Sequence, residues 1–340
     1  MTSPGIIAAA CRAFTADFPG QVAGISEPLG DAGWQVKWQD GLESRFPDGE
    51  LCIDLPEDPA GRTVLLWQSV TGDHAEPDVA IMSLLATARC YREHGAGRIV
   101  AVLPHLAYAR HDRHVPGQRR PVMAALLAGL AAAAGITDVV TLASGAQDLL
   151  ARLFTGTGTR LTFLPVHELH LDVLAPLMEA GSVLVAPDRG AADHVGMLAA
   201  ALGVPVLVAD KRRTGPEQVA VTLRCQEDLR GLRHAVIVDD LITSAATVEN
   251  VAWAIRDQAV DPRIDVVATH LRLTPGGAER LTRLCRQRTL HSIHTTDSAG
   301  RAVVLGGLTT RPAIPRMAQA LAAWLADDTS AVQPERRTLA

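Results

Sequence analysis

Aromatic residues are scarce in this 340-residue chain, where phenylalanine, tryptophan and tyrosine together make up only 4%. The hydrophobic fraction is nevertheless 48%, which is ample for a folded core and excludes a largely disordered chain. The core must therefore be aliphatic, built from alanine, valine and leucine. At roughly 100–200 residues per domain, the length favours two domains.

An excess of cationic residues is also absent. The 32 lysines and arginines are outnumbered by 37 aspartates and glutamates, which gives a formal net charge of −5. This balance argues against a protein that holds nucleic acid by bulk charge. It does not exclude a small anionic ligand, because a local basic site can lie in an acidic protein.

Cysteine patterns and long apolar runs are missing as well. The five cysteines are odd in number and none are spaced as CxxC, so neither a disulfide framework nor a zinc site is expected. The apolar runs fall short of the ~20 residues that span a bilayer. The N-terminus has no basic region followed by an apolar stretch, as a secretory signal requires. We expect a cytoplasmic protein with neither nucleic acid nor membrane as a partner.

Short β-branched runs alternate with Ala- and Leu-rich stretches of helical length along most of the chain. This alternation predicts βαβ units and parallel sheets covered on both faces. The expected strands are 63–67, 98–102, 138–142, 182–186, 204–209, 234–238 and 264–269. The expected helices are 78–94, 121–134, 147–154, 172–180, 191–202, 245–258 and 277–286. The least regular central stretch, 155–162, is expected to be a seam between two α/β domains of similar size.

The strongest chemical signal is HAVIVDDLITSAAT, residues 234–247. An apolar strand ends in Asp239 and Asp240, and a loop of small and hydroxyl residues leads into a helix. Ligands bind at the carboxyl ends of parallel strands, and a helix N-terminus suits phosphate. Ser244 and Thr247 can donate hydroxyl hydrogen bonds to that phosphate, while the aspartates suit sugar hydroxyls or magnesium. A phosphorylated sugar matches both ends of the loop. The alternative is that the aspartates only cap the helix.

This segment resembles the phosphoribosyl-pyrophosphate (PRPP) loop of phosphoribosyltransferases and of ribose-phosphate pyrophosphokinases, the PRPP synthetases. Other segments resemble synthetase motifs in the family's order over roughly residues 25–325. FPDGE at 46–50 resembles the nucleotide loop, LPHLAYARHDR at 103–113 the ATP segment, and VAPDRGA at 185–191 the metal-bearing motif. DKRR at 210–213 resembles the start of the flexible catalytic loop, and ATHLRLTPGGAERL at 268–281 a helix-leading segment.

The resemblance implies an α/β fold of two phosphoribosyltransferase-like domains, each a mainly parallel sheet flanked by helices. The expected bounds are 1–158 for the ATP-side domain and 159–310 for the domain with the ribose 5-phosphate loop. Residues 311–326 would form a C-terminal helix packing back on the first domain, and residues 327–340 a flexible tail.

The resemblance also assigns roles to individual residues. It implies transfer of a diphosphoryl group from ATP to ribose 5-phosphate by an Mg²⁺-dependent transferase, with a nucleotide site shared between subunits of a homo-oligomer, at least a dimer. Lys211 and Arg213 would be catalytic, and Asp188 a magnesium ligand. The ATP-binding residues would be Phe46, Asp48, Glu50, Arg110, His111 and Arg113. The ribose 5-phosphate loop would comprise Asp239, Asp240, Thr243, Ser244, Ala245, Ala246 and Thr247.

Each of these motifs also has a simpler interpretation. FPDGE can be a plain turn and DKRR a solvated basic loop, while Asp188 can cap a helix. The chain also departs from the family, which carries an Asp-Leu-His metal motif where this sequence reads Ala143-Ser144-Gly145. The favoured function is diphosphoryl transfer to ribose 5-phosphate or a closely related sugar phosphate. The alternatives are a non-catalytic regulatory or partner subunit and a phosphoribosyltransferase.

Overall fold

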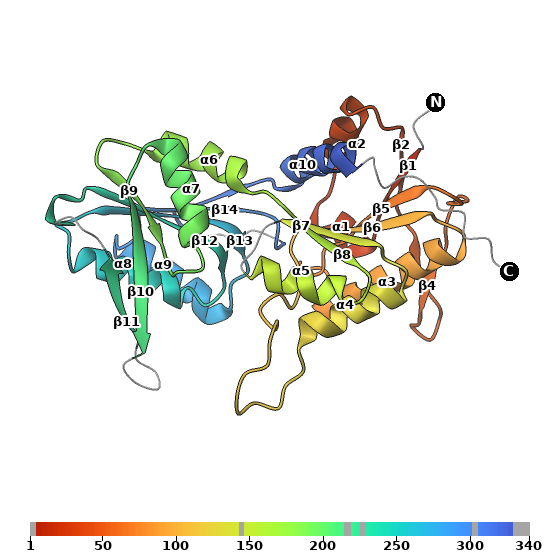
Figure 1. The fold of residues 1–340 in the computed structure, drawn as a ribbon, viewed down its shortest axis with the longest axis horizontal. Coiled ribbons are helices and arrows are strands. Elements are labelled where there is room, and N and C mark those ends of the chain that lie inside the picture. Colours follow the sequence, from red (N-terminus) through yellow and green to blue (C-terminus); the bar gives the residue numbers. More distant parts are fainter. Residues whose placement is uncertain (1–4, 143–145, 214–218, 225–228, 301–304, 329–340) are drawn as a thin grey trace. The chain divides into compact units, whose positions relative to one another are not determined.

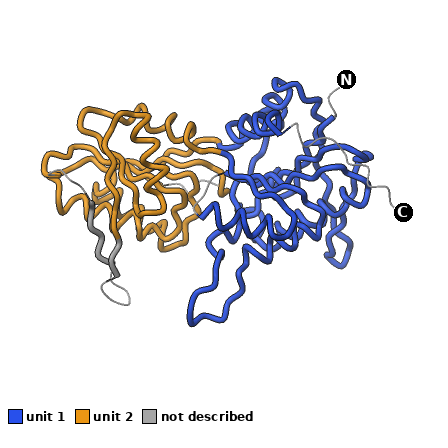
Figure 2. The backbone as a smooth tube through the Cα atoms, viewed as in Figure 1, with its two compact units in different colours: residues 1–164, 313–340 blue, residues 165–312 orange. Residues whose placement is uncertain are grey.

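The computed structural model describes residues 5–142, 146–213, 219–224, 229–300 and 305–328, and for 211–213 and 219–224 only the backbone. The chain divides into two compact units (Figure 2), one formed by residues 1–164 with 313–340 and the other by residues 165–312. The division follows the strand β8 (Arg160–Leu164), so residues 155–162, where the sequence predicted a seam, instead lead into an edge strand of the first sheet.

Unit 1 is built on a six-stranded sheet in the order β2-β1-β5-β6-β7-β8, in which every pairing is parallel. A separate antiparallel hairpin, β3-β4, follows β2 in the chain. The strands are β1 (Ile6–Ala10), β2 (Val36–Gln39), β3 (Glu43–Arg45), β4 (Leu51–Ile53), β5 (Thr63–Trp67), β6 (Arg98–Leu103), β7 (Asp138–Leu142) and β8. The central strands are almost entirely buried, as expected for a sheet covered on both faces.

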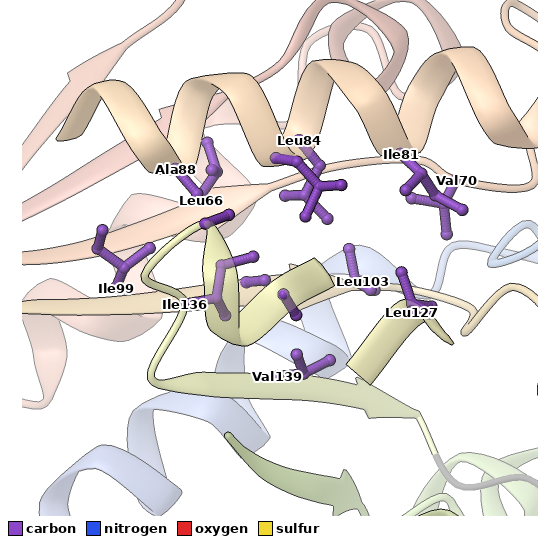
Figure 3. Packing of buried hydrophobic residues seen from close by; sticks show 14 of the residues in the cluster. Leu66, Val70, Ile81, Leu84, Ala88, Ile99, Leu103, Leu127, Ile136 and Val139 are labelled. Carbon is purple, nitrogen blue, oxygen red and sulfur yellow. The ribbon is translucent and has the colours of Figure 1, made fainter. Parts of the chain in front are cut away.

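Helices cover this sheet with aliphatic stripes. In α3 (Pro77–Glu93), Ile81, Leu84 and Ala88 recur at helical spacing and face Leu66 and Val70 (Figure 3), since residues three and four apart share a helix face. The other helices of unit 1 are α1 (Arg12–Asp17), α2 (Val22–Asp31), α4 (Met123–Ala133), α5 (Gln147–Thr155) and α10 (Ile314–Asp327).

The C-terminal helix α10 packs against α2 within unit 1. The guanidinium groups of Arg98 and Arg160 lie 5.0 and 5.2 Å from the Trp324 ring. Asp328, just after the helix, accepts hydrogen bonds from both arginines, at 2.7 Å from Arg98 Nη2 and 3.1 Å from Arg160 Nη1. These contacts tie the end of α10 to β6 and β8.

Unit 2 contains a seven-stranded sheet in the order β11-β10-β9-β12-β13-β14-β15 (Figure 1). All its pairings are parallel except that of β10 with β11. The strands are β9 (Ser182–Ala186), β10 (Val206–Arg213), β11 (Val219–Arg224), β12 (His234–Ile242), β13 (Arg263–Leu271), β14 (Ser292–Thr296) and β15 (Leu308–Arg311). Its helices are α6 (His167–Leu174), α7 (Ala192–Leu202), α8 (Ala246–Arg256) and α9 (Pro275–Arg286), with 3-10 turns η1 (Ala175–Leu177) and η2 (Leu229–Gly231).

The two sheets share one topology. In unit 1, β2 lies on one side of β1 while β5 to β8 follow in order on the other side. In unit 2, β10 lies on one side of β9 while β12 to β15 follow on the other. Each unit therefore has a switch point, the place beside its first strand where the strand order reverses direction. In parallel sheets, ligands generally bind at such a point, outside the carboxyl ends of the strands.

The predicted fold class, two mainly parallel α/β sheets flanked by helices, is confirmed. Two predicted elements are wrong in detail. The helix expected at 172–180 lies earlier, as α6 with the η1 turn after it, because Pro176 cannot continue an α-helix. The strand expected to end at 209 continues to Arg213, since β11 supplies an antiparallel partner for those residues.

Candidate functional site

The acidic residues of unit 2 gather at its switch point. Asp188 follows β9, and Asp239 and Asp240 lie near the carboxyl end of β12, the strand that pairs with β9 in parallel. Because the two strands are neighbours with the same direction, their carboxyl ends bring these three aspartates to one edge of the sheet. Asp188 therefore lies at the same edge of the sheet as the Asp239–Asp240 pair.

The crowding of these carboxylates changes the protonation of Asp239. Burial first, and then the charge of Asp240, raises the pKa of Asp239 to about 7, and Asp188 adds to the shift. The backbone N–H of Asp240 donates to Asp239 Oδ1 at 2.9 Å. A buried carboxylate whose ionised form is disfavoured gains from a cation or a hydroxyl donor beside it, because either partner stabilises the charge. Strongly shifted carboxylate pKa values of this kind are more typical of ligand sites than of helix caps.

The loop between β12 and α8 carries the predicted phosphate contacts Thr243 to Thr247. Its residue Ala245 has φ of +55° and ψ of 12°, a left-handed conformation that costs a residue with a Cβ roughly 1–2 kcal/mol. The Ser244 hydroxyl accepts a long hydrogen bond, 3.4 Å, from the Ala246 N–H at the start of α8. Strain of this kind is typical of ligand-binding loops. Ala246 begins the helix whose N-terminus was predicted to receive phosphate.

The segment 268–281 supports this loop, a role that the sequence did not reveal. Thr274 N donates to Thr243 O at 3.2 Å, and Arg280 donates to the carbonyl of Ser244 through its guanidinium. A Cβ placed on Gly277 would lie 3.2 Å from Ser244 Cα and closer still to the Thr243 carbonyl oxygen. The first turn of α9 therefore approaches the loop backbone as closely as only glycine permits. The signal in the sequence was the pair of glycines in LTPGGAERL.

Asp188 also has the local role that was considered as its alternative. Its Oδ1 accepts the backbone N–H groups of Gly190 and Ala191 at 3.0 and 3.2 Å. These bonds fix the turn that leads into α7. They orient the carboxylate beside Asp239 and do not prevent it from binding a cation, because a carboxylate has several acceptor sites.

A pair of histidines lies beneath the same edge, and sequence reasoning missed it. His170 Nδ1 is 2.9 Å from His194 Nε2, and His170 Nε2 is 3.0 Å from the Thr269 hydroxyl. Burial lowers the pKa of His170 to about 3, so this imidazole is neutral. Burial, and then His167, lowers the pKa of His194. The HELH segment at 167–170, which has no metal spacing, thus packs α6 against α7 and β13.

The predicted catalytic residues Lys211 and Arg213 occupy alternate positions of β10. They pair in register with Val221 and Val219 of β11. The prediction of a basic loop beyond the strand is wrong for these residues, because the strand itself extends through them. β10 pairs with β9 on the side opposite β12, so its carboxyl half leaves the sheet at the same switch point.

The predicted nucleotide loop FPDGE is the turn of the β3-β4 hairpin. Phe46 N donates to Glu50 O at 2.9 Å, Gly49 N to Phe46 O at 2.8 Å, and Glu50 N to Asp48 Oδ1 at 3.1 Å. Gly49 has φ of +94°, which the turn requires. The Phe46 side chain is 52% exposed, and an aromatic ring held in water at a tight turn is available to stack on a ligand.

The predicted ATP segment lies in the loop between β6 and α4. Arg113 makes a bidentate pair with Asp112, at 3.0 Å from Nε to Oδ1 and 2.6 Å from Nη2 to Oδ2, and this hydrogen bonding lowers the pKa of Asp112. His111 donates its N–H to Tyr108 O, at 2.8 Å, and Tyr108 has a φ of 61°. Arg110 precedes His111. In Figure 1 this loop projects from unit 1 well apart from the β3-β4 hairpin, so one chain does not bring the two nucleotide segments together.

Metal-ligating side chains do not cluster in threes in the part of the chain that the structure describes. A magnesium site with one or two carboxylates and substrate oxygens needs no such cluster. The departure at Ala143-Ser144-Gly145 lies outside the described residues.

Comparison with known proteins agrees with this geometry. Residues 26–135 match the family described as the N-terminal domain of ribose phosphate pyrophosphokinase. A ribose-phosphate pyrophosphokinase of Chromobacterium violaceum is 31% identical over 237 residues, 70% of this chain and 69% of that protein. One from Caldanaerobacter subterraneus is 34% identical over 263 residues, 76% and 77% of the two chains. The chain belongs to the ribose-phosphate pyrophosphokinase family. The resemblance found in the sequence is thereby confirmed, and the chain is an enzyme of the diphosphotransferase type.

The fold is also that of a solved pyrophosphokinase-family structure. The phosphoribosylpyrophosphate synthetase of Mycobacterium smegmatis aligns with a TM-score of 0.72, covering 95% of this chain and 99% of that one at 21% identity. This match agrees with the predicted pair of phosphoribosyltransferase-like sheets. Within the described residues, no helix combines the length and apolar character that crossing a bilayer demands.

Proposed function

We propose that the chain transfers the diphosphoryl group of ATP to the anomeric hydroxyl of ribose 5-phosphate or a closely related sugar phosphate, giving PRPP or its analogue and AMP. The observation that carries this proposal is the edge of unit 2, where Asp188, Asp239 and Asp240 meet the loop 243–247 at the start of α8. One end of this arrangement suits phosphate and the other suits sugar hydroxyls.

Sugar binding would divide along the loop. The hydroxyls of Thr243, Ser244 and Thr247, with the first N–H groups of α8, would hold the 5-phosphate. Asp240 would accept hydrogen bonds from ribose hydroxyls. The raised pKa of Asp239 means that its ionised form is disfavoured by burial and by Asp240, a cost that a bound divalent cation would relieve.

Magnesium fits these residues. Asp188 would hold it together with substrate oxygens and water. When bound, the ion neutralises charge on the transferring phosphates. Lys211 and Arg213 would bind those phosphates as charge develops during transfer. The ATP would be held by Arg110, His111 and Arg113 and by Phe46, Asp48 and Glu50 of a neighbouring copy, and the separation of the two segments within unit 1 supports such a shared site.

The test is a phosphorus NMR time course with ATP, Mg²⁺ and ribose 5-phosphate, in which AMP and PRPP should accumulate. Absence of AMP with this acceptor would refute PRPP synthesis, and a panel of other sugar phosphates would then separate a changed acceptor from an inert partner subunit. PRPP consumption with a free base, without ATP, would instead indicate a phosphoribosyltransferase.

Two variants test the assignments within that reaction. Lys211→Ala should lower turnover far more than substrate affinity, because its contact strengthens in the transition state, while Arg212→Ala, one position along β10, serves as the matched control. Asp240→Ala should weaken binding of the sugar phosphate with little change for ATP, and equal losses for both ligands would contradict its role.

A further inference from the structure

One face of the unit 2 sheet carries polar side chains up to the edge where the sugar phosphate is proposed to bind. On β12, Asp240 lies two residues after Val238, which belongs to the hydrophobic cluster beneath α6 and α7. In the parallel pairing of β12 with β13, Asp239 is opposite Ala268, so the next residues, Asp240 and Thr269, are opposite each other. Residues two apart on a strand share a face, as do parallel partners in register. Asp240 and Thr269 therefore lie on the face that α6 and α7 cover.

Two imidazoles lead from Thr269 back toward this edge. His170 Nε2 is 3.0 Å from Thr269 Oγ1, and His170 Nδ1 is 2.9 Å from His194 Nε2. His170 and Thr269 are enclosed, with 1% and 0% of their surfaces exposed, whereas His194, on the first turn of α7, is only half-buried. Burial, and then His167, lowers the pKa of His194, and the charge of Asp240 opposes this shift. His194 is therefore the outer, neutral imidazole of the pair, and it lies close enough to Asp240 to sense its charge.

The buried hydroxyl of Thr269 sets the direction of these hydrogen bonds. His170, kept neutral by burial, has one N–H and one bare nitrogen. If Nε2 carried the proton, the Thr269 O–H would have no acceptor among the described residues, which is costly for a buried donor. The favoured arrangement runs from the Thr269 O–H to His170 Nε2, and from His170 Nδ1–H to His194 Nε2.

This direction leaves His194 with its proton on Nδ1, because a neutral imidazole that accepts at Nε2 is protonated at its other nitrogen. Within the part of the chain that the structure describes, His194 Nδ1 makes no hydrogen bond. The edge therefore presents a fixed N–H donor near the carboxylate of Asp240, which accepts. A sugar hydroxyl is both donor and acceptor, so one hydroxyl can donate to Asp240 and accept from His194.

We propose that His194 is a specificity-determining residue of the sugar-phosphate site, which donates from Nδ1 to the ribose hydroxyl that Asp240 accepts from, and that His170 and Thr269 position it. This inference rests on the sugar site of the proposed function and adds what that site selects, namely a pentose phosphate with a hydroxyl at this place over its deoxy analogue. A site built to hydrogen-bond a hydroxyl rejects the analogue without it, because the polar groups of the site are then left unpaired.

The experiment is a binding cycle between protein variants and deoxy sugars. Calorimetry uses the full-length protein with Mg²⁺ and α,β-methylene ATP, in which the bond that diphosphoryl transfer breaks is replaced. It compares ribose 5-phosphate with 2-deoxyribose 5-phosphate and 3-deoxyribose 5-phosphate. The wild type should bind one of the deoxy sugars about tenfold or more weakly than ribose 5-phosphate. In His194→Leu this ratio should fall about three- to tenfold, which is the contribution of one neutral hydrogen bond.

Three variants serve as controls for the donor and its positioning. His194→Asn, whose amide can place an N–H near the position of Nδ1, should restore most of the ratio. His167→Gln, at an exposed position of α6, should match the wild type. Thr269→Val nearly keeps the size of the side chain but removes the hydroxyl, so both tautomers of His170 become accessible and the ratio should fall severalfold. Nitrogen-15 NMR of the ligand-free wild type should show the proton on Nδ1 of both His170 and His194.

The outcomes separate this inference from the function on which it rests. An unchanged ratio in His194→Leu, or protons on Nε2 of both imidazoles, overturns the role of His194 and leaves the sugar site in place. An equal loss of affinity for all three sugars in His194→Leu makes the residue merely structural and overturns the role as well, as does equal affinity of the wild type for all three. Failure of the wild type to bind ribose 5-phosphate would instead remove the sugar site itself, and both proposals with it.

Discussion

Gly277 offers the sharpest perturbation of the proposed sugar-phosphate site, because its replacement acts on the loop backbone without touching a candidate ligand group. In Gly277→Ala the added methyl would lie well inside 3.0 Å of the Thr243 carbonyl oxygen and 3.2 Å from Ser244 Cα. Both atoms are backbone, so no flexible side chain can yield. The loop or the start of α9 must shift by about an ångström to restore a normal contact.

That shift should affect both the stability of the protein and the position of the loop that binds the sugar phosphate. Overpacking costs about 1–3 kcal/mol of stability, partly offset by the gain of up to about 1 kcal/mol when alanine replaces glycine in a helix. A displacement of about 1 Å in a positioning element can lower the rate by about a hundredfold. We therefore expect a raised KM for ribose 5-phosphate, a lowered kcat and an unchanged KM for ATP.

Gly276→Ala is the matched control, because a methyl at this neighbouring position of α9 meets nothing within 4 Å. It carries the same gain in helix propensity without the collision. Steady-state kinetics with ribose 5-phosphate varied at saturating ATP, together with chemical denaturation, separates the two effects. Equal kinetic constants for the two variants would refute the inference that α9 positions the loop.

Three further changes follow from the same structure. Asp239→Asn should raise the free energy of unfolding of the magnesium-free protein above pH 7 by up to about 4 kcal/mol and leave it unchanged near pH 4. The reason is that the pKa of Asp239, raised to about 7 in the folded protein, makes the wild type lose stability as the pH rises. Chemical denaturation at both pH values checks this. Asp328→Asn should lower the free energy of unfolding by about 1.5–3 kcal/mol at pH 7, because it weakens the charged hydrogen bonds with Arg98 and Arg160. Since Arg160 lowers the pKa of Asp328, this difference should vanish at low pH, where the wild-type carboxylate is protonated. Gly145→His with Ala143→Asp should change the magnesium dependence of turnover in activity assays over a range of metal concentrations, and an unaltered dependence would contradict the alignment of this segment with the Asp-Leu-His motif.

The sequence predicted the fold class because the central strands are mostly apolar and show no alternation of polar and apolar residues. Runs such as 98–102 and 138–142 lie in strands that are buried on both faces. It missed β1, which is also buried throughout, because IIAAA near an N-terminus is too short and too alanine-rich to distinguish from a helix start. It missed β14 and β15, since their polar threonines conceal the strand pattern, which only the pairing of β14 with β13 and of β15 with β14 reveals.

The candidate site was predictable where a single chain segment contains both the secondary-structure elements and the polar side chains of the site. The strand, the paired aspartates and the helix start of residues 234–247 are contiguous, so their geometry follows from local rules. What supports the loop comes from elsewhere. Gly277 and Arg280 reach it from α9, and the His170–His194 pair joins two helices. Contacts between distant segments leave no periodic trace in a single sequence.

The shared topology of the two units explains why the chain can carry two switch points with different chemistry. In unit 2 the carboxyl end of β12 is acidic, and burial beside Asp240 and Asp188 raises the pKa of Asp239. In unit 1 the same position carries no aspartate pair; instead a buried Asp17 organises Ser69 and His74. Asp239 is crowded by like charges in unit 2, whereas Asp17 in unit 1 is enclosed by hydrogen-bonding partners. If the sugar phosphate binds beside the aspartates of unit 2, its affinity should rise when magnesium is present, because a divalent cation offsets the repulsion between carboxylates and phosphate.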